Sequence, residues 1–256
     1  MDLAFLESVV NMEFTNKVVV ITGAASGIGK LLSENFFNEG AIVNRLDINV
    51  EALNNTDSDN KYENYVVDLR NYDDIDSCIK KIIEKHSKID FLINCAGGNP
   101  GRICGDEKPF NELPISTIDW GVEVNFRAPM YTIRATINNM IANNYGVIIN
   151  LSSISGYTGS SSACDYSAEK SGLVGLTKSI ALLGAPHNVR CVCVTPGPVL
   201  TRPDMASMPT PLGRAAEVQE ITDLIMYLCS DKAAFITGSN YLIDGGRSCG
   251  GMKHSS

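Results

Sequence analysis

The chain has 256 residues, of which 44% are hydrophobic and 20% charged, so it holds enough apolar material for one sizeable core. Lysine and arginine number 21 against 29 for aspartate and glutamate, and the net charge of −8, without any basic run, argues against a nucleic-acid partner. No apolar stretch approaches the roughly 18 residues of a membrane-spanning helix. The first residues carry an acid at Asp2 and no basic start, so we expect neither a secretory signal nor a membrane partner.

Cysteine and histidine patterns bear on compartment and metal binding. The eight cysteines form no C-x-x-C pair, and Cys191 and Cys193 alternate with valines as small strand residues do. The three histidines are far apart, so the spacing of a zinc site is missing. These patterns predict free thiols in a reducing compartment, the cytoplasm, and no metal site.

Short runs rich in β-branched residues alternate with longer amphipathic segments along the whole chain. Most of these runs are almost continuously apolar, as strands of a parallel sheet covered on both faces should be. Strand–helix alternation of this kind predicts a doubly wound parallel α/β sheet of about seven strands with helices on both faces. The expected strands are Val18–Thr22, Ala41–Asp47, Asn64–Asp68, Phe91–Ala96, Gly146–Ser152, Val189–Thr195 and Asn240–Ile243.

Apolar residues at three- and four-residue spacing predict the helices between these strands. One helix is expected around residues 75–83, and another after residue 166. The longest pattern predicts a single helix of five turns, formed around Val122, Phe126, Met130, Ile133, Ile137 and Met140. The polar stretch 54–64 is expected to be a surface loop, and the absence of repeats and linkers favours a single domain.

A glycine-rich turn follows the first strand and leads directly into a helical pattern. Such a turn lets the backbone bend tightly and lets a diphosphate approach the helix N-terminus, where free N–H groups favour an anion. The spacing is G-x-x-x-G-x-G, and a plain strand–helix turn is the alternative interpretation. The residues expected to bind a dinucleotide here are Gly23, Ser26, Gly27, Ile28 and Gly29.

Asp47 ends the second strand, 18 residues after Gly29. An acid at this place can accept hydrogen bonds from both ribose hydroxyls of an adenosine, although a solvated strand-end acid is the simpler alternative. Arg45 is the nearby cation on the same strand. It is expected either to form an ion pair with Asp47 or to reach a 2′-phosphate.

Four motifs together resemble the signature of the short-chain dehydrogenase/reductase family, in order and near the family's spacing. The resemblance covers about residues 13–247 and implies a Rossmann-type fold and hydride transfer between a nicotinamide cofactor and a substrate. The motifs are Thr22-Gly23-x-x-x-Gly27-x-Gly29, Asn94-x-Ala96-Gly97, Tyr166-x-x-x-Lys170 and Pro196-Gly197.

Tyr166 and Lys170 lie four residues apart on an expected helix, so both side chains share one face. An unperturbed tyrosine has a pKa near 10, and a neighbouring ammonium and a cationic nicotinamide both favour the phenolate. Without the resemblance, a half-buried tyrosine beside a surface lysine is the common alternative. Ser153 lies 13 residues before Tyr166, the family's separation, whereas the adjacent Ser152 is chemically identical.

The resemblance implies further roles. Asn125 matches the fourth catalytic residue, which holds a water against the lysine; a buried asparagine bonded to backbone is the alternative. Ser153 and Tyr166 would bind the substrate oxygen, and Tyr166 and Lys170 would also contact the cofactor. The other implied cofactor contacts are Asp68, Leu69, Asn94, Ala96, Gly97, Pro196, Val199 and Thr201.

The chain departs from the family pattern in three places. Residues 1–11 precede the usual start at Met12, so we expect an N-terminal extension followed by one domain over 12–256. Segment 98–114 is long, and the substrate lid between residues 201 and 212 is short, so the long segment is expected to supply the missing wall. Its Arg102 and Lys108 either bind an acidic substrate or are simply solvated.

The resulting prediction is an NAD-dependent dehydrogenase or ketone reductase acting on a small secondary alcohol or ketone. An NADPH-dependent carbonyl reductase of the 3-oxoacyl type is the alternative within the enzyme class, and a non-catalytic NAD-binding module is the alternative outside it. Because helices 130–141 and from residue 166 onward resemble a family dimer interface, and strand 240–246 a second contact, we expect a homotetramer, or a homodimer.

Overall fold

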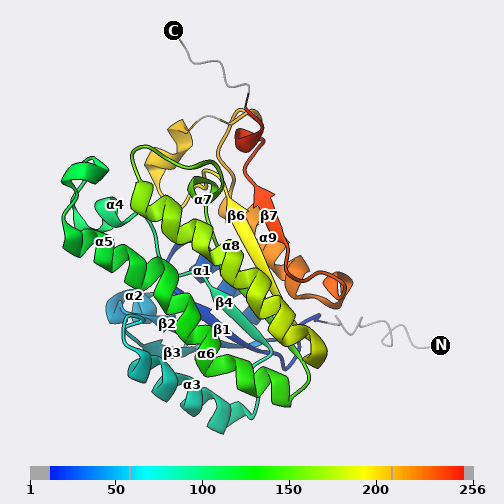
Figure 1. Cartoon of the computed structure of the whole chain (residues 1–256). Helices are drawn as coiled ribbons and strands as arrows, with labels where there is room; N and C mark the ends of the chain where they lie inside the picture. Colours follow the sequence, from blue (N-terminus) through cyan, green and yellow to red (C-terminus); the bar gives the residue numbers. More distant parts are fainter. Residues whose placement is uncertain (1–11, 58, 209, 251–256) are drawn as a thin grey trace.

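The computed structural model of the chain describes residues 12–57, 59–208 and 210–250. Its centre is a sheet of seven parallel strands in the order β3-β2-β1-β4-β5-β6-β7 (Figure 1), which confirms the predicted fold class. The expected extension, residues 1–11, lies outside the described residues. The strands are β1 (Val18–Thr22), β2 (Ile42–Asp47), β3 (Glu63–Val66), β4 (Phe91–Asn94), β5 (Gly146–Leu151), β6 (Val189–Pro196) and β7 (Asn240–Ile243).

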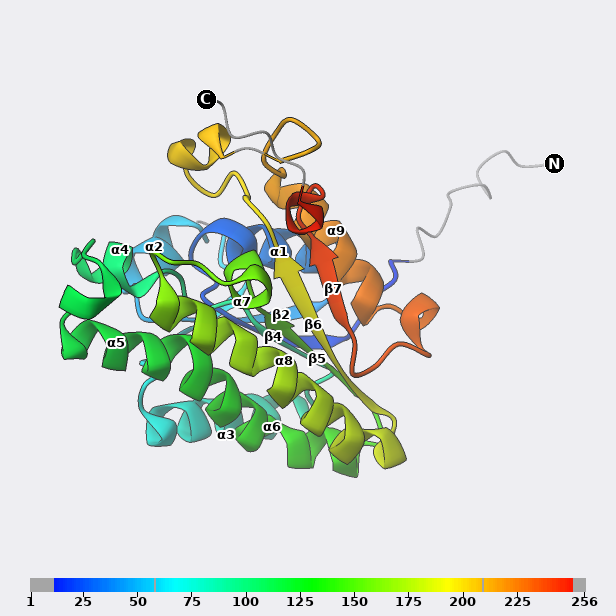
Figure 2. The ribbon, with the colours of Figure 1, turned by 45° about the horizontal axis from the view of Figure 1, so that its top comes forward.

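Helices cover both faces of the sheet (Figures 1 and 2). The longer helices α3 (Tyr72–His86), α6 (Ala128–Ala142) and α8 (Cys164–Gly184) pack on one face, and α1 (Gly27–Asn38) and α9 (Val218–Cys229) pack on the other. Because successive strand side chains point to opposite faces, β1, which is apolar from Val18 to Ile21, contributes to two cores. Val19 and Ile21 lie in the core beneath α1, and Val18 and Val20 in the core beneath α3.

The strand order reverses between β1 and β4, which makes this place the topological switch point of the sheet. From β1 the chain proceeds to β2 and β3 on one side, and then returns to β4 on the other side of β1. The connections that leave the carboxyl ends of β1 and β4 therefore diverge, and open α/β sheets bind ligands in the crevice formed there. Figure 2 shows β6 and β7 ending at the same edge, close to α7 (Ile154–Thr158).

Two predicted segments differ from the structure. The helix expected from Val122 onward begins as a π-helical stretch, Val122–Arg127, between α5 (Ile115–Gly121) and α6. The wider turn rotates the helix face, so Val122 is 41% exposed whereas Ile133 and Met140 are buried. In addition, α2 (Val50–Asn55) extends into the stretch that was expected to be a loop from residue 54, with the Asn49 side chain capping its N-terminus.

The remaining short helix, α4 (Pro100–Cys104), lies within the long segment after β4. Asn99 caps α4 by accepting a hydrogen bond from the backbone N–H of Arg102 at 3.1 Å. Among the described residues, no helix combines the length and apolarity that crossing a membrane requires.

Candidate active site

The glycine-rich turn after β1 builds a cradle for an anion. Gly27 has a φ of +52°, which favours glycine, and a Cβ on Gly29 would collide with the carbonyl of Gly23. The N-cap of α1 is Ser26, whose side chain makes no capping hydrogen bond, and no acid lies in the first turn. The helix N-terminus therefore keeps backbone donors for a ligand, and the cradle fits the diphosphate of a dinucleotide.

Asp47 holds this cradle in shape. Its Oδ2 accepts a hydrogen bond from the backbone N–H of Ala25 at 3.0 Å, and its Oδ1 accepts one from the N–H of Asn49 at 3.0 Å. Each carboxylate oxygen has a second lone pair, so the acid keeps acceptor capacity toward the cleft that it lines. This geometry agrees with a carboxylate presented to ribose hydroxyls.

Arg45 does neither of the things expected of it. Its side chain is fully buried and donates to the Ala24 carbonyl at 3.1 Å and to Thr56 Oγ1 at 2.6 Å. Its guanidinium also lies over the ring of Tyr62. Arg45 shares the strand face of Asp47, but these bonds hold its guanidinium beneath the glycine-rich turn, so within the described residues it pairs with Ala24 and Thr56 and not with Asp47, and it does not line the cleft.

One cleft of about 960 Å³ joins the glycine-rich turn to the expected catalytic residues. Sixteen of the eighteen site residues expected from the sequence line it, and the exceptions are Asn94 and Asn125. Those that line the cleft are Gly23, Ser26, Gly27, Ile28, Gly29, Asp47, Asp68, Leu69, Ala96, Gly97, Ser153, Tyr166, Lys170, Pro196, Val199 and Thr201.

Asn94 was expected to line the cofactor edge, but its side chain points into the protein. Its Oδ1 accepts from Thr132 Oγ1 at 2.7 Å, and its Nδ2 donates to Asn150 Oδ1 at 2.9 Å. Asn150 in turn donates to Thr177 Oγ1 at 2.9 Å. This buried polar chain links α6, β4, β5 and α8, because all of its members face the same side of the sheet. Asn94 is therefore a structural residue.

Ser153, Tyr166 and Lys170 meet in the cleft from two helices. Ser153 is the N-cap of α7, and its Oγ accepts from the N–H of Ser155 at 3.3 Å. Tyr166 and Lys170 lie one turn apart on α8, with the Lys170 Nζ 5.8 Å from the centre of the Tyr166 ring. The Lys170 Nζ also donates to the Leu151 carbonyl at 2.9 Å, which fixes the ammonium beneath the cleft.

The geometry also separates the two adjacent serines. Ser152 is 6% exposed, and its hydroxyl donates to the Lys170 carbonyl at 2.7 Å. The hydroxyl of Ser153 accepts from the N–H of Ser155 and lies beside the Tyr166 hydroxyl, so both hydroxyls can bind one oxygen of a ligand in the cleft. Ser153 is thus placed to contact a substrate, whereas Ser152 attaches α8 to the end of β5.

Burial controls the titration of this group. It raises the pKa of Tyr166, while the Ser153 hydroxyl and the charges of Arg102 and Arg202 lower it in part. This direction is opposite to the lowering that was expected from Lys170, whose Nζ lies toward the Leu151 carbonyl. Burial also lowers the pKa of Lys170 to about 8. The free chain therefore holds a neutral tyrosine beside a lysine that loses its proton easily.

Residues 17–211 match the family model for short chain dehydrogenase. The chain belongs to the short-chain dehydrogenase/reductase family. It is accordingly an oxidoreductase, of a family that binds a nicotinamide cofactor. The sequence resemblance is thereby confirmed.

Related short-chain dehydrogenases differ in their named activities. The chain is 35% identical over 247 residues to "Dehydrogenase/reductase SDR family member 6" of Aquarana catesbeiana, which covers 90% of this chain and 96% of that protein. It is 32% identical over 252 residues to "3-oxoacyl-[acyl-carrier-protein] reductase FabG" of Thermotoga maritima, with 92% and 99% covered. The solved structure of NAD⁺-bound xylitol dehydrogenase superposes with a TM-score of 0.84 at 26% identity, covering 91% of this chain and all of that one.

Asn125 lies behind the catalytic group of this short-chain dehydrogenase, in the π-helical stretch. It is fully buried, accepts from the N–H of Gly98 at 2.8 Å and donates to the Gly98 carbonyl at 2.9 Å. A Cβ on Gly97 would overlap the amide oxygen of Asn125. The asparagine thus clamps the segment that leaves β4 against the helix that carries it, as the alternative of a buried asparagine bonded to backbone predicts, and its role in holding a water against Lys170 stays a prediction.

Glu169 is a site residue that sequence analysis missed. Its Oε2 accepts from Asn125 Nδ2 at 2.8 Å, whereas its Oε1 is buried without a partner among the described residues. Burial raises the pKa of Glu169 to about 7, and the nearby Asp165 adds to the rise. No local signal could have found it, because adjacent residues of a helix point about 100° apart, so the burial of Lys170 does not imply that of Glu169.

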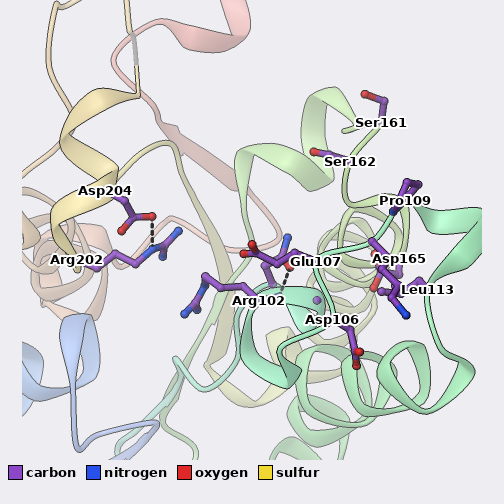
Figure 3. Close-up of a pocket in the computed structure, with 13 residues that line it drawn as sticks. Arg102, Asp106, Glu107, Pro109, Leu113, Ser161, Ser162, Asp165, Arg202 and Asp204 are labelled. Atoms are coloured by element: carbon purple, nitrogen blue, oxygen red, sulfur yellow. Dashed lines mark hydrogen bonds and ion pairs between the residues drawn. The ribbon is translucent and has the colours of Figure 1, made fainter.

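A second cavity, of about 600 Å³, adjoins the cleft on the side of α4 and the segment after β6 (Figure 3). Asn99, Arg102, Ser162 and Arg202 line both spaces. The segment after β4 therefore forms a wall of the cleft, as its length predicted. Arg202 was missed by sequence analysis, because nothing in the sequence shows which way the short lid folds.

Proposed function

We propose that the protein is an NAD-dependent dehydrogenase or ketone reductase that acts on a small secondary alcohol or the matching ketone. The observation that carries this proposal is the common cleft: Ser153, Tyr166 and Lys170 face the same space as the glycine-rich turn. A module that only binds a dinucleotide has no use for a serine–tyrosine–lysine group at this place. The family membership supplies the reaction type.

Each side chain has one task in the proposed reaction. The Ser153 hydroxyl donates a hydrogen bond to the reacting oxygen and holds it beside Tyr166. Tyr166 acts as the phenolate, which the charge of Lys170 and of a bound oxidised nicotinamide would favour against the effect of burial. The phenolate takes the hydroxyl proton during oxidation, and the phenol returns a proton during reduction. Lys170 would also bind the cofactor ribose, and the nicotinamide held there would supply the hydride acceptor.

Asn125 and Glu169 act through these residues. By clamping both backbone atoms of Gly98, Asn125 keeps the end of β4 open beside Lys170. Glu169 accepts the remaining amide proton of Asn125, so the asparagine has one fixed orientation. We propose that both are positioning residues.

The proposed preference for NAD rests on Asp47. A 2′-phosphate at this place would meet like charge, and at ~4 Å with an effective dielectric of ~20 one such pair opposes binding by about 4 kcal/mol before screening. The cation that could have offset this repulsion, Arg45, is buried beneath the turn. The NAD⁺-bound xylitol dehydrogenase among the structural relatives supports the same preference.

A 3-oxoacyl reductase is the second candidate, favoured by the similarity to the Thermotoga maritima enzyme. A panel of secondary alcohols, ketones and a 3-oxoacyl thioester, each with NAD(H) and NADP(H), separates the candidates. We expect alcohol oxidation with NAD to have the highest kcat/KM. Faster turnover of the thioester with NADPH would favour the reductase, and binding of either cofactor without any turnover would favour a non-catalytic module.

Assembly and compartment remain proposals as well. β7 is the edge strand of the sheet, and α8 carries Leu182 and Leu183 at 79% and 52% exposure, so both surfaces that the family uses for contacts are uncovered in one chain. We propose a homotetramer, built from a homodimer, in a reducing compartment such as the cytoplasm, where its eight free thiols persist. A monomeric mass by light scattering would contradict the assembly.

A further inference from the structure

We propose that the substrate is a hydroxy acid, or the matching oxo acid, whose carboxylate binds between Arg102 and Arg202. The inference rests on the proposed function, because it names the substrate class of the same site. It starts from the observation that these two arginines, on segments about a hundred residues apart in sequence, both line the catalytic cleft and the adjoining cavity.

The distribution of charge in the cleft is uneven. The acids that line it, within the described residues, are Asp47 and Asp68, both at the end expected to hold adenosine. Asp68 is already paired with Arg70, whose Nη2 donates to its Oδ2 at 2.6 Å. At the other end the cleft is lined by Arg102 and Arg202, whereas the acids beside them line only the adjoining cavity, so the side of the two guanidinium groups that faces the cleft favours an anion.

The two arginines have donors to spare. The Arg102 guanidinium makes no hydrogen bond or ion pair with any residue in the described part of the chain. Arg202 uses its Nε on Asp204 at 2.8 Å, which leaves its two terminal nitrogens without a partner there. A guanidinium presents its donors as a planar fork that matches a carboxylate, so unused forks on two sides of one opening form a site for an oxyanion.

The arginines also lie within electrostatic reach of the reacting group. Figure 3 shows the two guanidinium groups turned toward the same opening, Arg102 from α4 and Arg202 from the segment after β6. The charge of Arg102 lowers the pKa of Asp204, and both arginines lower the pKa of Tyr166. A carboxylate bound between the arginines would therefore be joined by only a few carbon atoms to the hydroxyl that Tyr166 deprotonates.

Cations and acids nearly balance in the adjoining cavity. Lys108 lines it together with the two arginines and four acids, and Asp106 and Asp204 already have partners in Thr117 Oγ1 and Arg202. Pro109 and Leu113 add an apolar part to this lining. A cavity of about 600 Å³ with such a mixed lining fits a small polar molecule.

The proposed reaction leaves the carboxylate unchanged. In the oxidative direction the carbinol C–H bond breaks and its hydrogen leaves with both electrons to the oxidised nicotinamide cofactor. The hydroxyl O–H bond breaks at the same time, its proton goes to Tyr166, and a C=O bond forms. A hydroxy acid thereby becomes an oxo acid, and a proton and the reduced cofactor are released.

The test compares short hydroxy acids, with the carboxylate one to three carbons from the carbinol, with their primary amides at saturating NAD. We expect kcat/KM for at least one acid to exceed that for its amide by roughly tenfold or more. Arg102→Gln and Arg202→Gln should each erase most of this preference by raising KM for the acid, because the loss of their charge near Tyr166 acts on acid and amide alike and cancels in the ratio. Arg134→Gln, the same substitution at an exposed position on α6, is the control and should keep the preference.

The dissociation constant of the cofactor shows which anion the arginines bind, the substrate carboxylate or the cofactor diphosphate. If the arginines bind the substrate, the NADH dissociation constant measured by fluorescence stays unchanged in both variants. If Arg102→Gln and Arg202→Gln weaken NADH binding and slow acid and amide equally, the arginines bind the cofactor diphosphate and the inference is overturned. Oxidation of neutral alcohols but of no acid would also overturn it, whereas failure to oxidise any alcohol would contradict the proposed function itself.

Discussion

The two ends of the cleft are built in different ways. At the end proposed to hold adenosine, the acids already have partners within the protein: backbone N–H groups bind both oxygens of Asp47, and Arg70 pairs with Asp68. At the end proposed to be catalytic, the Arg102 guanidinium has no partner in the described part of the chain. A site that binds the same ligand throughout a family can complete its own contacts in advance, whereas a site for the variable ligand has to leave donors free.

Replacing the proposed base should reduce turnover and leave the affinity for the cofactor nearly unchanged. Tyr166→Phe removes the hydroxyl that takes the substrate proton, so turnover should fall by about 10²–10⁴-fold, the range of general-base catalysis. The NADH dissociation constant should change little, because the phenol lies outside the cradle. Stopped-flow measurement of the hydride step tests this, and a variant that keeps a tenth of the wild-type rate would contradict the assignment.

Alanine substitutions of the two adjacent serines test which of them contacts the reacting oxygen. Ser153→Ala removes the hydrogen bond to the reacting oxygen and should slow turnover about 10²-fold or more. Ser152→Ala should act on the fold instead, because it removes the bond to the Lys170 carbonyl, and should cost about 1–2 kcal/mol of unfolding free energy with a mild loss of turnover. The opposite ranking of the two turnover numbers would show that the catalytic serine is Ser152.

A substitution at Asp47 should do the reverse and act on cofactor binding, both through the ribose and through the shape of the glycine-rich turn that it holds. The wild type should favour NAD over NADP in kcat/KM by roughly 30-fold, or about 2 kcal/mol. Asp47→Ala should erode that ratio, because it relieves the repulsion of a 2′-phosphate and loses the bonds to the ribose. The maximal rate with saturating NAD should remain close to that of the wild type. Equal use of both cofactors by the wild type would contradict the proposed role of Asp47.

The smallest expected effect concerns Glu169, and it is a change in how the free energy of unfolding depends on pH. Its pKa is about 7 in the folded chain against 4.5 when unperturbed, so the unfolded chain releases this proton first as pH rises. The free energy of unfolding should therefore fall with rising pH, by about 1 kcal/mol between pH 5 and pH 6 from this group. Glu169→Gln should remove this part of the slope in denaturant titrations, and Glu84→Gln, an exposed acid on α3, should leave it in place. Identical slopes for all three proteins would refute the raised pKa.

The fold and most of the cleft could be predicted because their signals are local. Continuous apolar runs define the strands, and the motif residues follow strand ends, so a parallel topology alone brings Gly27, Ser153 and Tyr166 to one edge. The errors concern the direction of single side chains. Asn94 lies near the expected site in sequence but points into the interior, and Arg45 shares the strand face of Asp47 but is held beneath the glycine-rich turn by Ala24 and Thr56.

Other features depend on packing that no local pattern carries. The π-helical stretch around Asn125 was hidden, because a continuous run of apolar spacing does not show one widened turn. Glu169 belongs to the site because the packing of α8 buries it. Arg202 belongs to it because the segment after β6 folds back over the cleft. These are the places where tertiary contacts, rather than sequence spacing, decide the chemistry.

The buried chain from Thr132 through Asn94 and Asn150 to Thr177 has a consequence for how related sequences can diverge. Each member both satisfies and depends on its neighbour, and a single apolar replacement would strand a partner at a cost of about 1–3 kcal/mol. Replacing the whole set with hydrocarbon avoids that cost. The four positions should therefore co-vary across homologues, inherited either as a complete hydrogen-bonded ladder or as a complete apolar one.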